Sequence, residues 1–126
     1  MHDNGTLHLS IPDIPVGPNG PRGLLRMHWA RRRRYNEGWS WQIRKAMGYP
    51  GILEAAPDKA CVTITQHRKR LMDSDNLYAS VKPLLDALVD WQLLYDDSPG
   101  HCELTVKQCI AVNGVHTDIV IEGKEG

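Results

Sequence analysis

The sequence is poor in cysteine and has no long apolar run, and each shortage excludes a class of protein. Its three cysteines, Cys61, Cys102 and Cys109, are odd in number and lack C-x-x-C spacing, which argues against a disulfide framework and against a zinc knuckle. The six histidines are scattered, with none at ligand spacing from a cysteine, so we expect no zinc site. Apolar runs of only a few residues cannot span a membrane. The first residues lack a basic stretch followed by an apolar one, so we expect a cytoplasmic location.

The length and composition are those of one globular domain. The chain has 126 residues, of which 41% are hydrophobic and 24% are charged. This is short for two ordinary domains, but it is long enough to bury roughly two-thirds of the surface that the unfolded chain exposes. We therefore expect one domain that spans residues 1–126.

A net charge of zero hides two blocks of opposite sign. Fifteen basic residues balance fifteen acidic ones, which by itself argues against a polyanionic partner. Between Asp13 and Glu37, however, every formally charged residue is basic: Arg22, Arg26, Arg31, Arg32, Arg33 and Arg34. From residue 71 to residue 103 a single lysine, Lys82, accompanies seven acids, which are Asp73, Asp75, Asp86, Asp90, Asp96, Asp97 and Glu103. Such asymmetry indicates a functional surface.

The pattern along the chain predicts an α+β fold with a small mixed sheet. Alternating apolar and polar residues predict strands over residues 7–11, 60–66, 104–112 and 117–122. The Asn113-Gly114 pair is typical of a hairpin turn between the last two strands. Interleaved with two helices, these strands predict a sheet of about four strands packed by two main helices.

The first helix is expected from about Ala30 to Met47. A loop rich in proline and glycine, residues 12–23, precedes it. The expected apolar face consists of Trp41, Ile43, Ala46 and Met47, and Tyr49-Pro50-Gly51 ends the helix.

A second helix is predicted between Asp75 and Leu94. Its apolar side chains recur at the helical period on one face: Leu77, Val81, Leu84, Leu85 and Leu88. The charged side chains fall on the opposite face: Asp75, Lys82, Asp86 and Asp90. Pro83 costs about 3 kcal/mol inside a helix. Either the helix is kinked there, or it starts late, with Ser80 as N-cap and Pro83 in the first turn.

Two carboxylates follow the second strand and its basic patch, His67-Arg68-Lys69-Arg70. If the backbone is extended, the side chains of Asp73 and Asp75 point the same way. At about 5 Å they repel by about 3 kcal/mol at an effective dielectric near 20, and a Mg²⁺ ion bound to carboxylates and substrate phosphates would offset this. The alternative is that Asp75 caps the helix and Asp73 lies in a turn. Asp96-Asp97 either adds a third carboxylate or forms a turn of its own.

Four elements in order give the sequence a resemblance to a known family. They are Asp73-Ser74-Asp75-Asn76-Leu77, Lys82, Asp86-Ala87-Leu88 and Asp96-Asp97. This order resembles the D-x-D-N-L…K…D-A-L…D-D signature of the RusA family of Holliday-junction resolvases, small endodeoxyribonucleases of bacteria and their phages. Pro18-Asn19-Gly20 and Arg26-Met27-His28-Trp29 resemble the loop before that family's first helix. The chain departs from the family in three extra residues before Lys82, namely Tyr78, Ala79 and Ser80.

The resemblance implies metal-dependent cleavage of DNA. It implies that Asp73, Asp75 and Asp97, assisted by Asp96, bind catalytic Mg²⁺ or Mn²⁺ and that Lys82 contacts the scissile phosphate. It also implies a RusA-like fold and a homodimer that nicks a four-way junction symmetrically in DNA recombination and repair, encoded by a bacterium or a phage. Two alternatives stay open: a structure-selective nuclease for other branched DNA, and a catalytically silent junction-binding protein.

The basic residues are the candidate DNA-binding surface. They are Arg26, His28, Arg31, Arg32, Arg33, Arg34, Arg68, Lys69 and Arg70, which can neutralise phosphates beside the cleavage site. Because successive helical residues point in different directions, only about half of residues 31–34 can contact one duplex. His28 and Trp29 either stack on bases at an opened junction or pack under the preceding loop.

Overall fold

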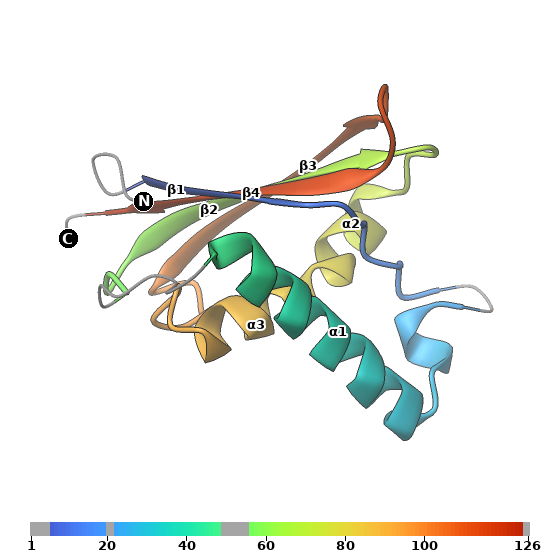
Figure 1. The fold of residues 1–126 in the computed structure, drawn as a ribbon, viewed down its shortest axis with the longest axis horizontal. Coiled ribbons are helices and arrows are strands. Elements are labelled where there is room, and N and C mark those ends of the chain that lie inside the picture. The colour runs from blue at the N-terminus through green and yellow to red at the C-terminus, as the bar shows by residue number, and fades with distance from the viewer. Residues whose placement is uncertain (1–5, 20–21, 49–55, 125–126) are drawn as a thin grey trace.

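The computed structural model describes residues 6–19, 22–48 and 56–124. In chain order, its elements are β1 (Thr6–Ile11), a 3-10 turn (Leu24–Arg26), α1 (Trp29–Met47), β2 (Ala60–Arg68), α2 (Ser74–Ser80), α3 (Lys82–Asp90), β3 (Cys102–Ile110) and β4 (His116–Gly123). They form two layers, a four-stranded sheet and the helices beside it (Figure 1). Within these ranges, no helix combines enough length and apolar character to cross a membrane.

The order of the strands explains why the helices share one face of the sheet. That order is β1-β4-β2-β3, with β2 parallel to β3 and β4 antiparallel to both β1 and β2. β1, β2 and β3 therefore run in the same direction, and the connections through α1 and through α2–α3 advance the same way across the sheet. Because such crossovers are right-handed, both sets of helices lie on the same face. Figure 1 shows α1, α2 and α3 together on that face.

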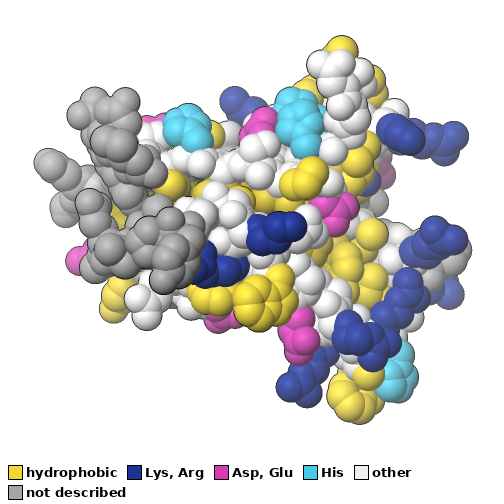
Figure 2. Space-filling model, in the orientation of Figure 1, with side chains coloured by type: hydrophobic (Ala, Val, Ile, Leu, Met, Phe, Trp, Pro, Cys, Tyr) yellow, Lys and Arg dark blue, Asp and Glu magenta, His cyan; other side chains and the backbone are white. Residues whose placement is uncertain are grey.

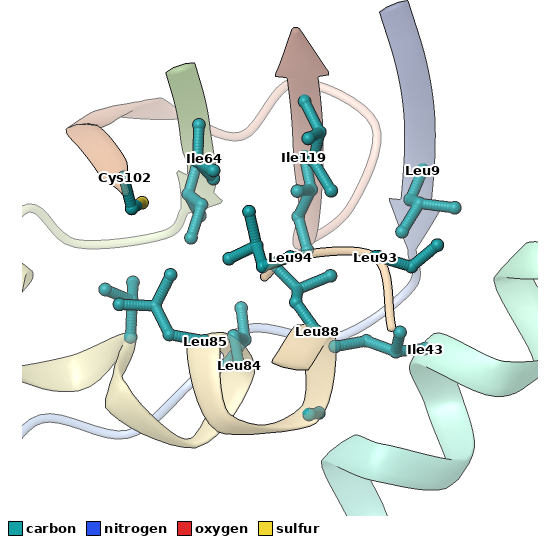
Figure 3. Packing of buried hydrophobic residues seen from close by; sticks show 14 of the residues in the cluster. Leu9, Ile43, Ile64, Leu84, Leu85, Leu88, Leu93, Leu94, Cys102 and Ile119 are labelled. Atoms are coloured by element: carbon teal, nitrogen blue, oxygen red, sulfur yellow. The ribbon is translucent and has the colours of Figure 1, made fainter. Parts of the chain in front are cut away.

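The hydrophobic core lies between the sheet and the helices. Figure 3 shows side chains of three strands, Leu9, Ile64 and Ile119, directed toward α3 and α1. They meet Leu84, Leu88 and Ile43, which are all fully buried. Along β1, β2 and β4 the buried positions alternate with partly or fully exposed ones. This alternation confirms the strand prediction. The buried positions face the helices, and the alternate positions lie on the other face of the sheet (Figure 1).

The predicted second helix is two helices joined at Val81. All five residues of its predicted apolar stripe are buried, but the backbone leaves the helix at Val81 (φ −92°, ψ 0°). Pro83 lies in the first turn of α3, where an N–H would have no acceptor within the helix, so the proline breaks no helical hydrogen bond. The late start is thus confirmed, except that Val81 occupies the cap position and Ser80 instead donates its hydroxyl to the carbonyl of Leu77 at 2.6 Å.

The predicted apolar face of the first helix is only partly right. Ile43 is buried, and the residue beside it on the same face is Trp39, four positions earlier, which is also buried. Trp41 is 63% exposed, because a residue two positions from Ile43 points to another side of the helix. The stop predicted at 49–51 lies outside the described residues.

The hairpin predicted at Asn113-Gly114 is wrong. The chain does reverse there, with Gly114 at φ +100°, a conformation that glycine adopts readily. β2 nevertheless lies between β3 and β4 and pairs with both. Turn residues determine that the chain reverses, but not which strand becomes its neighbour.

Candidate functional site

The first acidic pair lies at the start of α2. Asp73 is the N-cap residue, with an extended backbone (φ −62°, ψ 149°), and Asp75 belongs to the first helical turn. Both side chains are exposed. The extended backbone that would make the two carboxylates converge therefore ends at Asp73. The alternative prediction, that Asp75 caps the helix and Asp73 lies in a turn, is also wrong. Asp73 occupies the cap position, and its carboxylate makes no capping hydrogen bond.

Contacts from two other elements hold the backbone of this segment. Met72 donates its N–H to Gln108 of β3 at 2.9 Å, and its carbonyl accepts from the same side chain at 2.6 Å. Asn19, in the loop before α1, donates its side-chain amide to the side chain of Asn76 at 3.1 Å. Gln108 thus fixes the backbone directly before Asp73, and the Asn19 contact joins the side chain of Asn76 to the loop. The carboxylates of Asp73 and Asp75 remain exposed.

Gly23 shapes the loop that carries Asn19. A Cβ atom at Gly23 would lie 2.3 Å from the carbonyl oxygen of Asn19, so only glycine fits without moving the backbone. Around this contact, Leu24 and Leu25 donate to the carbonyls of Gly17 and Pro18, each at 3.0 Å. The close approach places Asn19 beside α2.

A second charged group lies at the start of α3. Lys82 contacts Asp97 at 2.5 Å and Asp86 at 3.0 Å. These two hydrogen-bonded carboxylates, Asp97 first, raise the pKa of Lys82 above its ordinary value. Beside them, a hydrogen bond from the Ser98 side chain lowers the pKa of Asp96. The structure therefore brings Lys82 and Asp97 together.

The structure does not join these two groups into one closed set of metal ligands. The seven residues of α2, about 10 Å of helix, separate Asp73 from the beginning of α3. Within the described part of the chain, the three-ligand cluster at metal-binding distance contains none of the motif's aspartates. Ionised, exposed carboxylates have the donor chemistry that Mg²⁺ and Mn²⁺ prefer. These side chains fit such an ion by their chemistry, but they would have to turn toward it.

A groove of about 450 Å³ separates α1 from α3. Its lining residues are Trp29, Arg32, Arg33, Asn36, Glu37, Ser40, Pro83, Asp86, Ala87 and Asp90. The α1 wall carries Arg32 and Arg33 together with Glu37, which pairs with Arg33 at 3.3 Å, and the α3 wall carries two acids, Asp86 and Asp90. Asp86 of the α3 wall also contacts Lys82, the residue directly before Pro83.

The basic surface is formed mainly by the start of α1. Arg31, Arg32, Arg33 and Arg34 are all exposed, and Figure 2 shows basic side chains gathered at the end of the molecule where α1 begins. His28 caps the helix by accepting from the N–H of Ala30 at 3.3 Å. Trp29, beside the His28 ring, is 72% exposed. The prediction that Trp29 packs under the loop is therefore wrong, and its ring is available for stacking. Arg26 is exposed as well.

Arg68 has a structural position instead. Its guanidinium donates to the side chain of buried Gln66 at 2.7 Å and to the carbonyl of Pro15 at 3.0 Å. Burial lowers its pKa from the ordinary value. Of this predicted patch, only Lys69 and Arg70 are exposed.

No protein-family model matches the chain, and a search of curated proteins found no significant match.

One cluster of possible metal ligands was not predicted from the sequence. His67, His116 and Asp118 place ligand atoms within 4.8 Å of one another. The expectation of no zinc site considered cysteine spacing alone. The available signal was His116-x-Asp118 within a strand, because side chains two apart in a strand lie on the same face.

Proposed function

We propose that the chain is a metal-dependent endodeoxyribonuclease of RusA type that cuts four-way DNA junctions. The observation that carries the proposal is the ordered motif from Asp73 to Asp97, whose Lys82–Asp97 contact is made between residues 15 positions apart. Its charged side chains lie on the solvent side of α2 and α3, and the arginines of α1 line the same groove as Asp86.

In this proposal each group has a separate task. Asp73, Asp75 and Asp97, with Asp96 beside them, would bind Mg²⁺ or Mn²⁺, which when bound activates water and neutralises the attacked phosphate. Lys82 would contact the phosphate as a point charge. A phosphate beside Lys82 would compete with the carboxylate of Asp97 for the ammonium group. The exposed arginines bind the flanking phosphates, and a homodimer would present two such sites.

The open arrangement of the carboxylates favours a second candidate. In a catalytically silent junction-binding protein, the arginines and the fold would suffice, and no productive metal geometry would be needed. A third outcome is a structure-selective nuclease with the same residues but another branched substrate. The three candidates differ in whether cutting occurs and on which DNA.

The test compares labelled four-way, flap and duplex DNA with and without Mg²⁺ or Mn²⁺. We expect metal-dependent paired nicks in the four-way junction, and we expect Asp75→Asn to lose cutting while it still binds the junction in EDTA. Asp58→Asn is the matched control, because Asp58 precedes β2 whereas the motif follows it, and it should cut normally. Tight binding without cutting in any metal would favour the silent binder, and preferred cutting of flaps would favour the second nuclease. Undiminished cutting by Asp75→Asn would refute the metal assignment.

A further inference from the structure

Two histidines and an aspartate meet on the face of the sheet that carries no helices. His67 is the next-to-last residue of β2, and His116, its pairing partner, begins β4. Asp118, two residues further along β4, points to the same side. Figure 2 shows histidine and acidic side chains in contact on the sheet side of the molecule. The cluster thus lies where the ladder between two strands ends.

The two imidazoles converge on a single carboxylate oxygen. Nε2 of His67 lies 3.0 Å from Oδ2 of Asp118, and Nε2 of His116 lies 3.5 Å from the same atom. The rings are stacked, with centroids 3.8 Å apart and an interplanar angle of 11°. A tetrahedral ion with bonds of about 2.0–2.1 Å separates its ligands by about 3.3 Å. The two nitrogen–oxygen distances lie on either side of that value. Because nearly parallel rings direct their lone pairs side by side, at least one ring would have to rotate for both nitrogens to bind the same ion.

The outer nitrogen of each ring has a partner of its own. Nδ1 of His116 is 3.2 Å from the carbonyl oxygen of Gly114. A carbonyl can only accept, so this nitrogen carries the hydrogen, and in the neutral ring the lone pair of Nε2 then faces the carboxylate. Nδ1 of His67 contacts the thiol of Cys109 at 3.1 Å. Metal-binding histidines typically have such outer hydrogen bonds, which fix the tautomer and the ring orientation.

The lone pair of His116 facing a carboxylate calls for a positive charge between them. A bound cation would supply it. Two imidazoles and one carboxylate form a donor set that suits a borderline transition metal rather than Mg²⁺. The side chains of His67, His116 and Asp118 are 24%, 33% and 42% exposed, so an ion can enter and water can complete its coordination.

We propose that His67, His116 and Asp118 bind one Zn²⁺-class transition-metal ion, at a site separate from the carboxylates of α2 and α3. The ion links the end of β2 to the start of β4, and it has one open position toward solvent. Cys109 acts through His67, whose orientation it fixes, and is not itself a ligand. The proposal does not depend on the nuclease function.

The test uses the full chain without a purification tag, stripped with a chelator and titrated with Zn²⁺ and, for its visible spectrum, with Co²⁺. We expect one ion per chain, tetrahedral d–d absorption with Co²⁺, and a Zn²⁺-dependent rise in Tm, because a ligand that binds only the folded state stabilises it. His116→Gln and Asp118→Asn should each lose the spectrum and the rise in Tm.

Three controls separate this site from other sources of binding. His101 lies directly before β3, whereas Cys109 lies near the end of that strand. His101→Gln, Asp75→Asn and Cys109→Ala should each keep one bound ion. The proposal fails if the stripped chain binds no Zn²⁺ or Co²⁺, or if His116→Gln and Asp118→Asn bind as the parent does. Thiolate-to-Co²⁺ charge-transfer absorption in the parent would make Cys109 a ligand and would overturn the ligand assignment.

Discussion

At the scale of single residues, Tyr35 connects α1 to the loop before it. Its hydroxyl accepts the N–H of Val16 at 2.8 Å, and the ring packs partly against the core. Burial disfavours the charged phenolate and so raises the pKa of Tyr35 above the ordinary value of 10.0. The protein therefore keeps this proton at a pH where the unfolded chain has lost it.

This shift predicts how Tyr35→Phe changes stability with pH. Near neutrality the variant should lose about 1 kcal/mol, because the N–H of Val16 loses its partner. Above about pH 10 the unfolded parent releases a proton that the folded parent retains, so the contribution of Tyr35 falls as pH rises. Urea unfolding at about pH 8 and about pH 11 should show a smaller difference between parent and variant at the higher pH. A difference that grows with pH would contradict the direction of the shift.

Ser80 belongs to a buried polar group that joins α2 to β2. Its hydroxyl accepts from the side-chain amide of Gln66 at 2.9 Å, and both residues are completely buried. Ser80→Ala leaves that amide hydrogen without a partner, which should lower the free energy of unfolding by about 1–3 kcal/mol. Ser74→Ala is the matched control, since Ser74 is exposed on the same helix and should change stability by less than about 0.5 kcal/mol. Equal effects in urea unfolding would mean that water replaces the hydroxyl.

At the scale of elements, the end of α3 explains how Asp97 reaches Lys82. Leu93 donates its N–H to the carbonyl of Leu88 at 2.8 Å, and Gln92 donates to that of Val89 at 3.0 Å. Together with φ +63° at Gln92, this is a Schellman motif. It turns the chain so that Leu93 and Leu94 are buried against α3. The following residues then return toward the start of that helix.

Gln92, at the left-handed position of the Schellman motif, is an unfavourable residue for that conformation. A side chain at positive φ costs about 1–2 kcal/mol. Glycine avoids this cost, but its greater freedom in the unfolded chain offsets part of the gain. Gln92→Gly should therefore stabilise the protein by about 0.5–1 kcal/mol in thermal or urea unfolding, whereas Gln92→Ala keeps the strain and should not. A loss of stability in Gln92→Gly would show that the side chain has a contact worth more than the strain.

The elements were predictable from local patterns, and their connections were not. The helical stripe from Leu77 to Leu88 and the alternation in the strands report burial directly, so these predictions were right. The neighbour of β4 depends on long-range pairing, which turn residues such as Asn113 and Gly114 do not encode. The predicted convergence of Asp73 and Asp75 failed because α2 begins at Ser74, between them. Local sequence patterns predict the boundaries of helices and strands less reliably than their existence.

At the scale of the whole molecule, zero net charge does not describe what a DNA strand encounters. Salt screens charges over about 8 Å under physiological conditions, whereas α1 alone, with 19 residues, is about 28 Å long. A phosphate near the start of α1 therefore senses the arginines more strongly than the distant acids. The acids of α3 that lie across the groove would repel DNA unless Lys82 or a cation stands between them and the phosphates.

This separation of charge predicts the salt dependence of DNA binding. If Arg32 and Arg33 each neutralise a phosphate, Arg32→Ala/Arg33→Ala should reduce the slope of log K against log[salt] by about 0.9 for each phosphate that is no longer neutralised. Junction binding is measured in EDTA over a series of salt concentrations, so that cleavage does not interfere. Lys59→Ala/Lys107→Ala removes the same charge from exposed positions before and on the sheet, and should leave the slope nearly unchanged. Equal slopes for the two double variants would mean that DNA senses the total charge and not the basic end of α1, and the groove would then lose its assigned role.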